Sequence, residues 1–599
     1  MLTVSRPSAI VSAGLLVLAA GRAEATFTKV TTGDIVTTPA RYWTASWGDY
    51  DDDGYLDLFA GADFGSTRNF LYHNEGDGTF TLVDPAAIPK VPSNQHGSAW
   101  ADYDNDGHLD LFVTAGNFFT GNGEIHNAIY RNNGDGTFTV TTSGPLYDAG
   151  GGFHAPSWAD YDEDGLVDLF IAGHGAVNRL YRNAGDGTFP RVTSTPIVQE
   201  FGASECRSFV DYDDDGDVDL FVGNADQTHT NFLYRNDGNG KFTPVADSGL
   251  SNNEDTWGCS WADYDNDGHA DLFLANTGGH PNSLYHNEGD GTFTDVTETA
   301  GLLEPAPPNE NWVSPAWGDY DNDGFVDLFV TTGNCYPDPT NCVPRTNALY
   351  HNEGDGTFTK VTEGPVVNDV VTQCPAATWG DYDRDGFLDL FVAQGAVAPT
   401  PQTNLLYHND GNANAWLNVK LIGTRSNRSA IGARVRVNAF YGGASRWQLR
   451  DVSGGDSNNN QQSLDAEFGL ADAPIVDTVR IEWPSGRVQQ LHDVATRQFL
   501  TVTEPGVRPA CEDGIDDDGD GLVDMADPGC PLPFASPENP LCDDGIDNDG
   551  NGLVDFADPK CQLGWPYWEN APKLSCGLGG EIALLIAPLL FLRRRLRRD

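Results

Sequence analysis

The sequence predicts an all-β protein in which a seven-bladed β-propeller precedes a small β domain. The pattern W-[GA]-D-Y-D-x-D-G-x-x-D-L-F, which begins with Phe209-Val210 in one copy, occurs seven times at spacings of 51 to 62 residues. Such a period fits four short strands per unit. A second pattern close to L-Y-[HR]-N-x-G-[DN]-G follows each copy, and its glycines are typical of a hairpin turn. Repeated four-stranded units of this kind close radially into a propeller.

The first unit illustrates the expected strands. One strand ends at Trp47, and the others cover residues 56–60, 69–73 and 79–83. The seventh unit lacks its last T-F-T strand, whereas an unpaired copy, residues 26–30, precedes the first unit. We therefore expect the N-terminal strand to complete the seventh blade, which leaves no open edge. The residue before each first-strand aromatic is small, which predicts that the aromatics pack between blades.

Composition limits the classes of partner. The 599 residues include 88 Asp and Glu but only 34 Lys and Arg, giving a formal net charge of −54. Nucleic-acid binding is not expected, because a phosphate backbone requires a basic surface. An aromatic content of 11% also argues against a disordered acidic chain.

The acidity is concentrated in one loop of each repeat. Asp occupies loop positions one, three, five and nine, and Gly occupies position six. Oxygen ligands at this spacing, with a backbone carbonyl at position seven, suit Ca²⁺, and crowded carboxylates repel each other without a cation. We predict a structural calcium ion in each loop. The candidate ligands are Asp49, Asp51, Asp53 and Asp57; Asp102, Asp104, Asp106 and Asp110; Asp160, Asp162, Asp164 and Asp168; Asp211, Asp213, Asp215 and Asp219; Asp263, Asp265, Asp267 and Asp271; Asp319, Asp321, Asp323 and Asp327; and Asp381, Asp383, Asp385 and Asp389.

Two near-duplicate modules in residues 506–570 repeat the loop chemistry. Each reads C-x-D-G-I-D-x-D-G-x-G-L-V-D-x-A-D-P-x-C and is too small for a core, so a metal ion and one disulfide are expected to stabilise it. The expected pairs are Cys511–Cys530 and Cys542–Cys561. Together the repeats and modules predict about nine Ca²⁺ sites. The candidate ligands of the modules are Asp516, Asp518, Asp520 and Asp524, then Asp547, Asp549, Asn551 and Asp555.

The loops differ from EF-hands, since position twelve is not Glu and a strand follows instead of a helix. They resemble the calcium loops of integrin α-subunits and of FG-GAP or VCBS-type repeats. Residues 414–505 change pattern and contain alternating stretches such as 416–421 and 433–437, which predict a compact β domain.

This domain resembles the ASPIC/UnbV domain. The resemblance rests on the segments Ser426-Asn427-Arg428, residues 431–435, Phe468-Gly469-Leu470 and residues 483–486. It implies a secreted, acidic, calcium-binding protein of the cartilage acidic protein type. One departure is an Asn/Gln-rich run at residues 456–462, where the family shows an aromatic-containing Gly-rich turn.

Both ends of the chain resemble targeting segments. Residues 1–25 combine Arg6, an apolar stretch and Ala23-Glu24-Ala25, which predict a secretory signal in preference to a membrane span. Residues 571–599 place a Cys-Gly pair before an apolar run and an Arg cluster. They resemble a bacterial sorting signal cut by a sortase-like enzyme, with a plain tail anchor as the alternative. The expected location is thus the bacterial cell surface, with membrane contact only through this segment.

The loops opposite the acidic loops vary between repeats and are the expected ligand surface. We interpret the protein as a non-enzymatic module that binds an extracellular glycan or protein. The alternatives are a calcium-dependent enzyme acting on polysaccharide, in which His96, His154 and Arg207 supply the chemistry, and a structural spacer. Cys335 and Cys342 are expected to pair, whereas Cys206, Cys259 and Cys374 have no assigned partners. The residues expected on the variable face are Arg41, Tyr42, Trp43, His96, Phe118, Phe119, His154, Glu205, Arg207, Trp257, Trp312 and Tyr336.

Overall fold

The computed structural model describes residues 25–505, except 63–67, 92–94, 117–125, 148–152, 226–228, 247, 251–254, 304–311, 334–343, 372, 396–400, 456 and 458. The described residues up to Glu504 form one compact unit. The regular secondary structure of the described residues is nearly all β, and their helices are α1 (Asp34–Thr37), α2 (Pro365–Asn368) and the 3-10 helix η2 (Pro196–Val198). No helix among them is long and apolar enough to cross a membrane.

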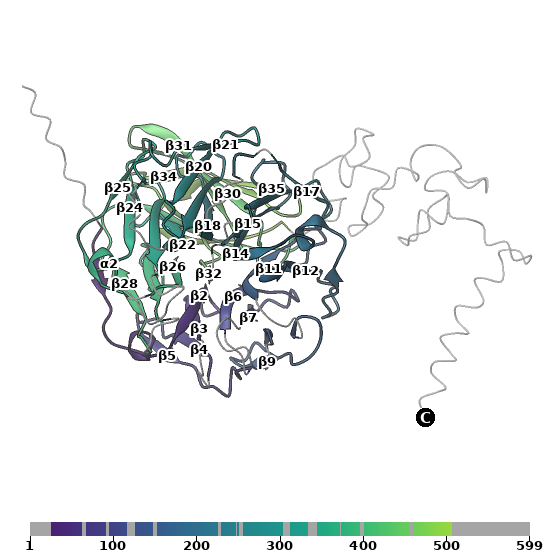
Figure 1. The fold of residues 1–599 in the computed structure, drawn as a ribbon. Coiled ribbons are helices and arrows are strands. Elements are labelled where there is room, and N and C mark those ends of the chain that lie inside the picture. Colours follow the sequence, from purple (N-terminus) through teal and green to yellow (C-terminus); the bar gives the residue numbers. More distant parts are fainter. Residues whose placement is uncertain are drawn as a thin grey trace, which may run out of the picture. The chain divides into compact units, whose positions relative to one another are not determined.

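Each repeat forms a four-stranded antiparallel unit, and the units surround a common centre (Figure 1). The prediction of an all-β propeller is confirmed. The first unit contains β2 (Tyr42–Gly48), β3 (Asp57–Ala62), β4 (Phe70–Asn74) and β5 (Phe80–Leu82). The second contains β6 (Gln95–Ala101), β7 (Asp110–Ala115), β8 (Ala128–Asn132) and β9 (Phe138–Val140). The third contains β10 (Phe153–Ala159), β11 (Asp168–Val177), β12 (Arg179–Tyr181) and β13 (Arg191–Val192).

The remaining units follow the same order. The fourth contains β14 (Phe201–Val210), β15 (Asp219–Asn224), β16 (Phe232–Asn236) and β17 (Phe242–Pro244). The fifth contains β18 (Thr256–Ala262), β19 (Asp271–Asn276), β20 (Ser283–Asn287) and β21 (Phe293–Asp295), and the sixth contains β22 (Trp312–Gly318), β23 (Asp327–Thr332), β24 (Ala348–Asn352) and β25 (Phe358–Lys360). The seventh contains β26 (Ala376–Gly380), β27 (Asp389–Ala393) and β28 (Leu405–Asn409). The long β11 also pairs with β14, which joins the third and fourth units.

The N-terminal strand closes the ring as predicted. β1 (Phe27–Lys29) pairs antiparallel with β28, with Phe27 opposite Asn409. The first-strand tryptophans also link neighbouring units: Trp100 Nε1 donates to Ser46 O at 3.3 Å and Trp379 Nε1 donates to Ala316 O at 3.2 Å. Trp47 Nε1 reaches Thr378 O at 3.4 Å, which connects the first unit to the last.

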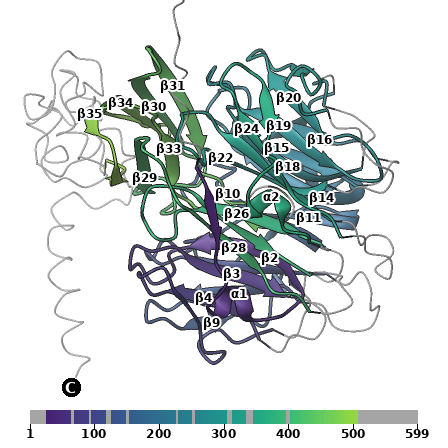
Figure 2. The same cartoon turned by 90° about the vertical axis from the view of Figure 1, so that its left-hand side faces the viewer.

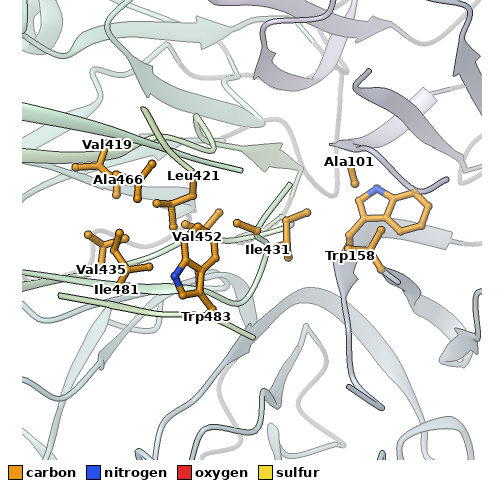
Figure 3. Packing of buried hydrophobic residues seen from close by; sticks show 14 of the residues in the cluster. Ala101, Trp158, Val419, Leu421, Ile431, Val435, Val452, Ala466, Ile481 and Trp483 are labelled. Atoms are coloured by element: carbon orange, nitrogen blue, oxygen red, sulfur yellow. The ribbon is translucent and has the colours of Figure 1, made fainter. Parts of the chain in front are cut away.

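Residues 414–505, which we call the cap, form two further sheets. One has the order β33-β29-β36 and the other β31-β30-β34-β35. Figure 2 shows these strands on one side of the blades. Val419, Val435 and Ile481 form the centre of their core, which continues past Ile431 to Trp158 of the propeller (Figure 3). The strands are β29 (Trp416–Ile422), β30 (Arg434–Tyr441), β31 (Ala444–Asp451), β33 (Ala466–Gly469), β34 (Ile475–Glu482), β35 (Val488–Ala495) and β36 (Gln498–Thr503).

Two motif segments of the cap meet at one buried carboxylate. Glu504 Oε2 accepts hydrogen bonds from the backbone N–H groups of Thr424, Arg425 and Ser426 at 2.7 to 2.9 Å. Its other oxygen accepts the Ser485 hydroxyl. Burial alone raises the pKa of Glu504, but the Ser485 hydroxyl and the backbone donors outweigh it, so the net pKa lies below the ordinary value. The ionised carboxylate therefore joins the S-N-R and W-P-S-G segments.

A segment of the cap fills the centre of the propeller. Residues 454–461, which we call the plug, include β32 (Asn460–Gln461), which pairs in parallel with β2 and lies near the middle of the ring in Figure 1. Gln461 exchanges two hydrogen bonds with the backbone of Trp100, at 2.6 and 3.0 Å. A Cβ atom at Gly454 would lie 2.1 Å from Trp158 O, so only glycine permits this approach. The plug overlaps the Asn/Gln-rich run, residues 456–462, that departs from the family pattern.

The plug contacts inner strands around the ring. Ser157 Oγ donates to Gly455 O at 2.7 Å, and Thr378 Oγ1 donates to Gln461 O at 3.0 Å. Arg207 Nη1 donates to Ser457 O at 2.6 Å. Since these donors belong to the third, seventh and fourth units, the plug connects distant parts of the ring.

Two of the three unassigned cysteines pair. Cys206 on β14 and Cys259 on β18 form a disulfide between the fourth and fifth units. Cys374 is a buried thiol beside Asn347, and burial raises its pKa to about 12. Cys335, Cys342 and the cysteines of the C-terminal modules lie outside the described residues.

Ring closure by β1 gives the first testable prediction. Phe27 packs with its ring centroid 5.6 Å from that of Tyr320 and 6.1 Å from that of Trp379. Phe27→Ala should lower the free energy of unfolding by about 1–3 kcal/mol, because a half-buried aromatic contact is lost. Urea denaturation measures this free energy. The control is Thr28→Ala at an exposed position, for which we expect a free energy of unfolding within about 0.5 kcal/mol of wild type. Equal effects of the two substitutions would contradict closure through Phe27.

Glu504 gives a pH-dependent prediction. Because its pKa is lowered in the folded protein, its stabilising effect is present above about pH 4.5 and is lost as the pH falls further. Glu504→Gln should cost roughly 1.5–3 kcal/mol at neutral pH, the range for hydrogen bonds to a charged group. The difference from wild type should shrink below pH 4.5 in urea denaturation at several pH values. A difference independent of pH would show that the charge of Glu504 has no part in cap stability.

Candidate functional site

The acidic loops, one between the first two strands of each unit, share one set of three hydrogen bonds. In the first unit, the position-nine carboxylate of Asp57 accepts from Tyr50 N at 3.1 Å and from Asn74 N at 2.8 Å. The Asn74 side chain then donates to Tyr382 O in the preceding loop of the ring at 2.8 Å. The equivalent three bonds occur in all seven units. Each loop is therefore tied to its own blade and to the next one.

The loop backbone explains the spacing of the motif. The position-one carboxylate of Asp102 accepts from Asp106 N at 3.0 Å and from Gly107 N at 2.7 Å, and the second to seventh loops share this arrangement. Position six has a positive φ, 100° at Gly107, which favours glycine. The turn brings the Asp residues of each loop together. In the sixth loop, ligand-type atoms of Asp321, Asp327 and His351 lie within 4.8 Å of one another.

The carboxylates are arranged as in a metal site. One oxygen each of Asp49, Asp162, Asp213 and Asp383 is buried without a hydrogen-bond partner among the described residues. Burial also raises the pKa of Asp57 to about 7 and that of Asp110 to about 9. Buried carboxylate oxygens without donors are costly unless a cation offsets their charge. Their number, spacing and oxygen chemistry fit a hard divalent cation.

A basic residue of the L-Y-[HR]-N motif lies beside most of these loops. His73 Nδ1 lies 3.2 Å from Asp57 Oδ1, and histidines occupy this position in the first, fifth, sixth and seventh units. Arg131 in the second unit contacts Asp104 and Asp106, each at 2.6 Å. Arg182 in the third unit repeats this contact, whereas Arg235 in the fourth pairs with the turn residue Asp237. The loops therefore differ in the basic residue beside them, although all seven carry Asp at the same four positions.

The cap covers the face that carries the acidic loops. Lys420 Nζ lies 2.9 Å from Asp49 Oδ2, and Arg434 Nη1 lies 2.9 Å from Asp211 Oδ2. Arg436 donates to Gly268 O at 3.0 Å, and Ala471 N donates to Asn322 O at 2.8 Å. The opposite face of the ring, where the first strands begin, is not used by these contacts.

The mouth cluster lies at that opposite face and consists of Trp43, His96, His154, His174, Glu205 and Trp257. Five of these residues, all except His174, stand four positions before the first-strand aromatic of the first to fifth units. Each lies where the register between the first two strands shifts by one residue, a β-bulge. Bulges redirect side chains and are common beside functional sites.

Five members of the mouth cluster, all except Trp257, form a continuous series of contacts. Trp43 stacks on His96 with ring centroids 4.6 Å apart, and the rings of His96 and His154 are 5.4 Å apart. His154 Nδ1 lies 2.7 Å from Glu205 Oε2, and His174 Nδ1 lies 2.5 Å from Glu205 Oε1. Burial lowers the pKa of His154 to about 4. Burial alone would raise the pKa of Glu205, but the two imidazoles lower it to about 2.

The structure corrects part of the predicted variable face. Tyr42 and Trp312 are buried between blades, because they lie one position away from the bulge and a one-residue step reverses the side of a strand. Arg207 is fully buried and donates to Pro156 O and to the plug, so its predicted place on the exposed variable face is wrong. Phe118, Phe119 and Tyr336 lie outside the described residues.

Sequence reasoning missed His174. It lies on β11, the second strand of the third unit, which continues to Val177 and pairs there with β14, and the repeat pattern does not show this extension. The predicted ligands of the C-terminal modules, from Asp516 to Asp555, lie outside the described residues, as do the first 24 residues and the C-terminal segment.

Family comparison agrees with the repeat pattern. A model described as FG-GAP-like repeat matches residues 49–113, 117–171, 160–222, 211–274, 264–330 and 336–392. A model described as ASPIC and UnbV matches residues 423–509.

Similar proteins were found among curated sequences and solved structures. Cartilage acidic protein 1 of Mus musculus is 28% identical over 294 residues, 48% of this chain and 42% of that protein. The Homo sapiens protein is 28% identical over 311 residues, 50% and 43% of the two chains. The chain thus matches less than half the length of these relatives.

Two solved structures resemble the chain more distantly. An Agrocybe aegerita lectin described as recognising non-reducing terminal N-acetylglucosamine is 21% identical, with a TM-score of 0.37, covering 62% of this chain and 86% of that one. The exotype rhamnogalacturonan lyase YesX is 12% identical, with a TM-score of 0.38, covering 64% and 75%. Similarity at this level carries no functional argument.

The FG-GAP-like matches span more than half of the chain. The chain therefore belongs to the FG-GAP-like repeat family and carries an ASPIC and UnbV domain after its repeats.

Proposed function

We propose that the protein is an extracellular calcium-binding propeller that recognises a glycan or protein ligand through its mouth cluster. Calcium ions in the acidic loops have a structural role: the carboxylates at positions one, three, five and nine would hold each ion, with the position-seven carbonyl as a further ligand. The supporting observation is the set of buried carboxylate oxygens without hydrogen-bond donors among the described residues, placed in loops of similar backbone geometry.

The cap covers one face of the propeller and leaves the other face available to a ligand. Since the cap contacts the acidic loops and the plug fills the channel from that side, recognition is left to the opposite mouth. Trp257 provides partly exposed aromatic surface there in a cluster that also holds polar groups, a combination that suits glycan or protein recognition, whereas Trp43 and His96 are buried. An extracellular location is supported by the predicted secretory signal and by the Cys206–Cys259 disulfide, since disulfides persist in oxidising compartments.

Calcium binding is tested by one isosteric substitution in the third unit. Asp162→Asn removes a loop charge whose Oδ1 is buried without a partner, and should remove one Ca²⁺ per chain. One ion contributes about 2.7 kcal/mol at a free concentration of 100 times its Kd, so the calcium-dependent rise in Tm should shrink. Elemental analysis and calorimetry with and without chelator measure both effects.

The control is Asp186→Asn, which removes a charge from the exposed turn of the same unit. It should keep the wild-type calcium content and the full response to chelator. Equal calcium content in the two variants, or a wild-type Tm that does not change with chelator, would contradict the proposed sites.

Ligand recognition is tested with the calcium-loaded protein on an array of extracellular glycans. Trp257→Ala should weaken binding to any retained glycan about 30-fold, the loss expected for an aromatic anchor worth roughly 2 kcal/mol. Trp447→Ala, an exposed tryptophan of the cap, should leave binding unchanged. An array without any bound glycan, or equal losses in both variants, would contradict glycan recognition at the mouth and favour a protein ligand or a spacer.

A further inference from the structure

The mouth cluster differs from the rest of the ring in the residues that its bulges present. Four positions before the first-strand aromatic, the seven units carry Trp43, His96, His154, Glu205, Trp257, Val313 and Pro375. The second, third and fourth units therefore place two imidazoles and a carboxylate at adjacent, equivalent positions. Because the scaffold repeats and these side chains do not, the fold itself does not require an imidazole or a carboxylate at this position.

A second strand completes the set. His174 on β11 lies opposite Ala203 in the pairing of β11 with β14, and the register shifts immediately after it. Gly175 has a φ of 64° at this shift, which favours glycine. The extension of β11 that joins the third and fourth units thus brings a second imidazole to the carboxylate of Glu205.

The backbone around His154 is fixed by the neighbouring unit. A Cβ atom at Gly97 would lie 2.5 Å from His154 O, and the Thr114 hydroxyl donates to the same oxygen. The side chains of His154 and Glu205 are 6% and 2% exposed, whereas that of His174 is 28% exposed. The cluster is therefore buried and positioned on two sides and reachable from solvent through His174.

We propose that His154, His174 and Glu205 bind one divalent transition-metal ion of the Zn²⁺ class. Ligand atoms of the three residues lie within 4.8 Å of one another. Two imidazole nitrogens and a carboxylate oxygen suit Zn²⁺, whereas Ca²⁺ takes oxygen ligands, so this site differs in chemistry from the acidic loops. Metal–ligand distances of about 2.1 Å at a tetrahedral ion require ligand atoms about 3.4 Å apart. The His174–Glu205 and His154–Glu205 contacts, at 2.5 and 2.7 Å, must then each open by less than about 1 Å.

The test measures zinc retention in the full-length, calcium-loaded protein. Zinc is added in excess together with millimolar Ca²⁺, which keeps the acidic loops filled, and the protein is then gel-filtered and analysed for metal. We expect about one retained Zn²⁺ per chain, and visible absorption bands of imidazole-bound Co²⁺ when cobalt replaces zinc. A variant combining His154→Ala and His174→Ala should lose both signals.

His408→Ala is the matched control, because His408 contacts the carboxylates of the seventh acidic loop. It should retain the zinc and the cobalt bands. If the double variant does not fold, judged by its Tm in calcium, Glu205→Gln tests the same site with an isosteric change and should weaken zinc binding at least tenfold.

Wild-type protein that retains no zinc would overturn the proposal and leave the cluster as an ion pair joining two blades. Zinc lost in His408→Ala but kept in Glu205→Gln would also overturn it, by placing the ion in the loops. Because the readout is zinc in the presence of calcium, it does not depend on whether the acidic loops bind Ca²⁺ or whether the mouth binds a glycan.

Discussion

The ring depends on a buried carboxylate at position nine of each acidic loop. In the first unit, Asp57 holds the start of the loop through Tyr50 and the third strand through Asn74, and the Asn74 amide bonds the preceding loop. The loop, its own blade and the preceding loop are therefore linked through one charged carboxylate. Such a group is costly to bury without compensation, so the arrangement that closes the ring also creates a demand for cations. The seven loops contribute 28 of the 88 Asp and Glu residues behind the formal charge of −54, and the proposed calcium ions would offset that charge.

The cap meets the acidic face with opposite charge and fills the channel with amides. Lys420 and Arg434 reach the position-one carboxylates of two loops. The inner strands present backbone N–H and C=O groups to the channel, and a side-chain amide satisfies both kinds, as Gln461 does at Trp100. An Asn/Gln-rich plug is thus chemically matched to a polar channel. Because the plug belongs to the cap, the two open ends of the ring differ. The aromatic and histidine side chains at the bulges lie at the end that the cap does not cover.

Much of the fold was predictable because its determinants repeat. Seven copies of one motif fix the blades, and the missing last strand, with its copy at residues 26–30, predicted closure by β1. The interblade position of Trp47 followed from the small residues beside it. The acidic residues of each loop were also found from spacing alone, since their ligand pattern is local in sequence.

What could not be predicted depends on contacts between distant segments. A bulge shifts which side of a strand a residue faces, so Tyr42 and Trp43 could not be separated from the sequence, and His174 was missed because a strand extension brings it to Glu205. Arg207 is used by a plug about 250 residues away, and residues 456–462 gave no sign of entering the channel. The pairing of Cys206 with Cys259 likewise required knowing that their strands are adjacent first strands.

The most direct test is a crystal structure of the calcium-loaded protein with long-wavelength anomalous data. We expect an anomalous peak between the carboxylates of each of the seven acidic loops, with Arg131 and Arg182 moved away from the oxygens that they contact in the second and third loops. Intact loops without anomalous density, and with both guanidinium groups still on the carboxylates, would contradict the central claim that calcium ions neutralise the loops and stabilise the ring.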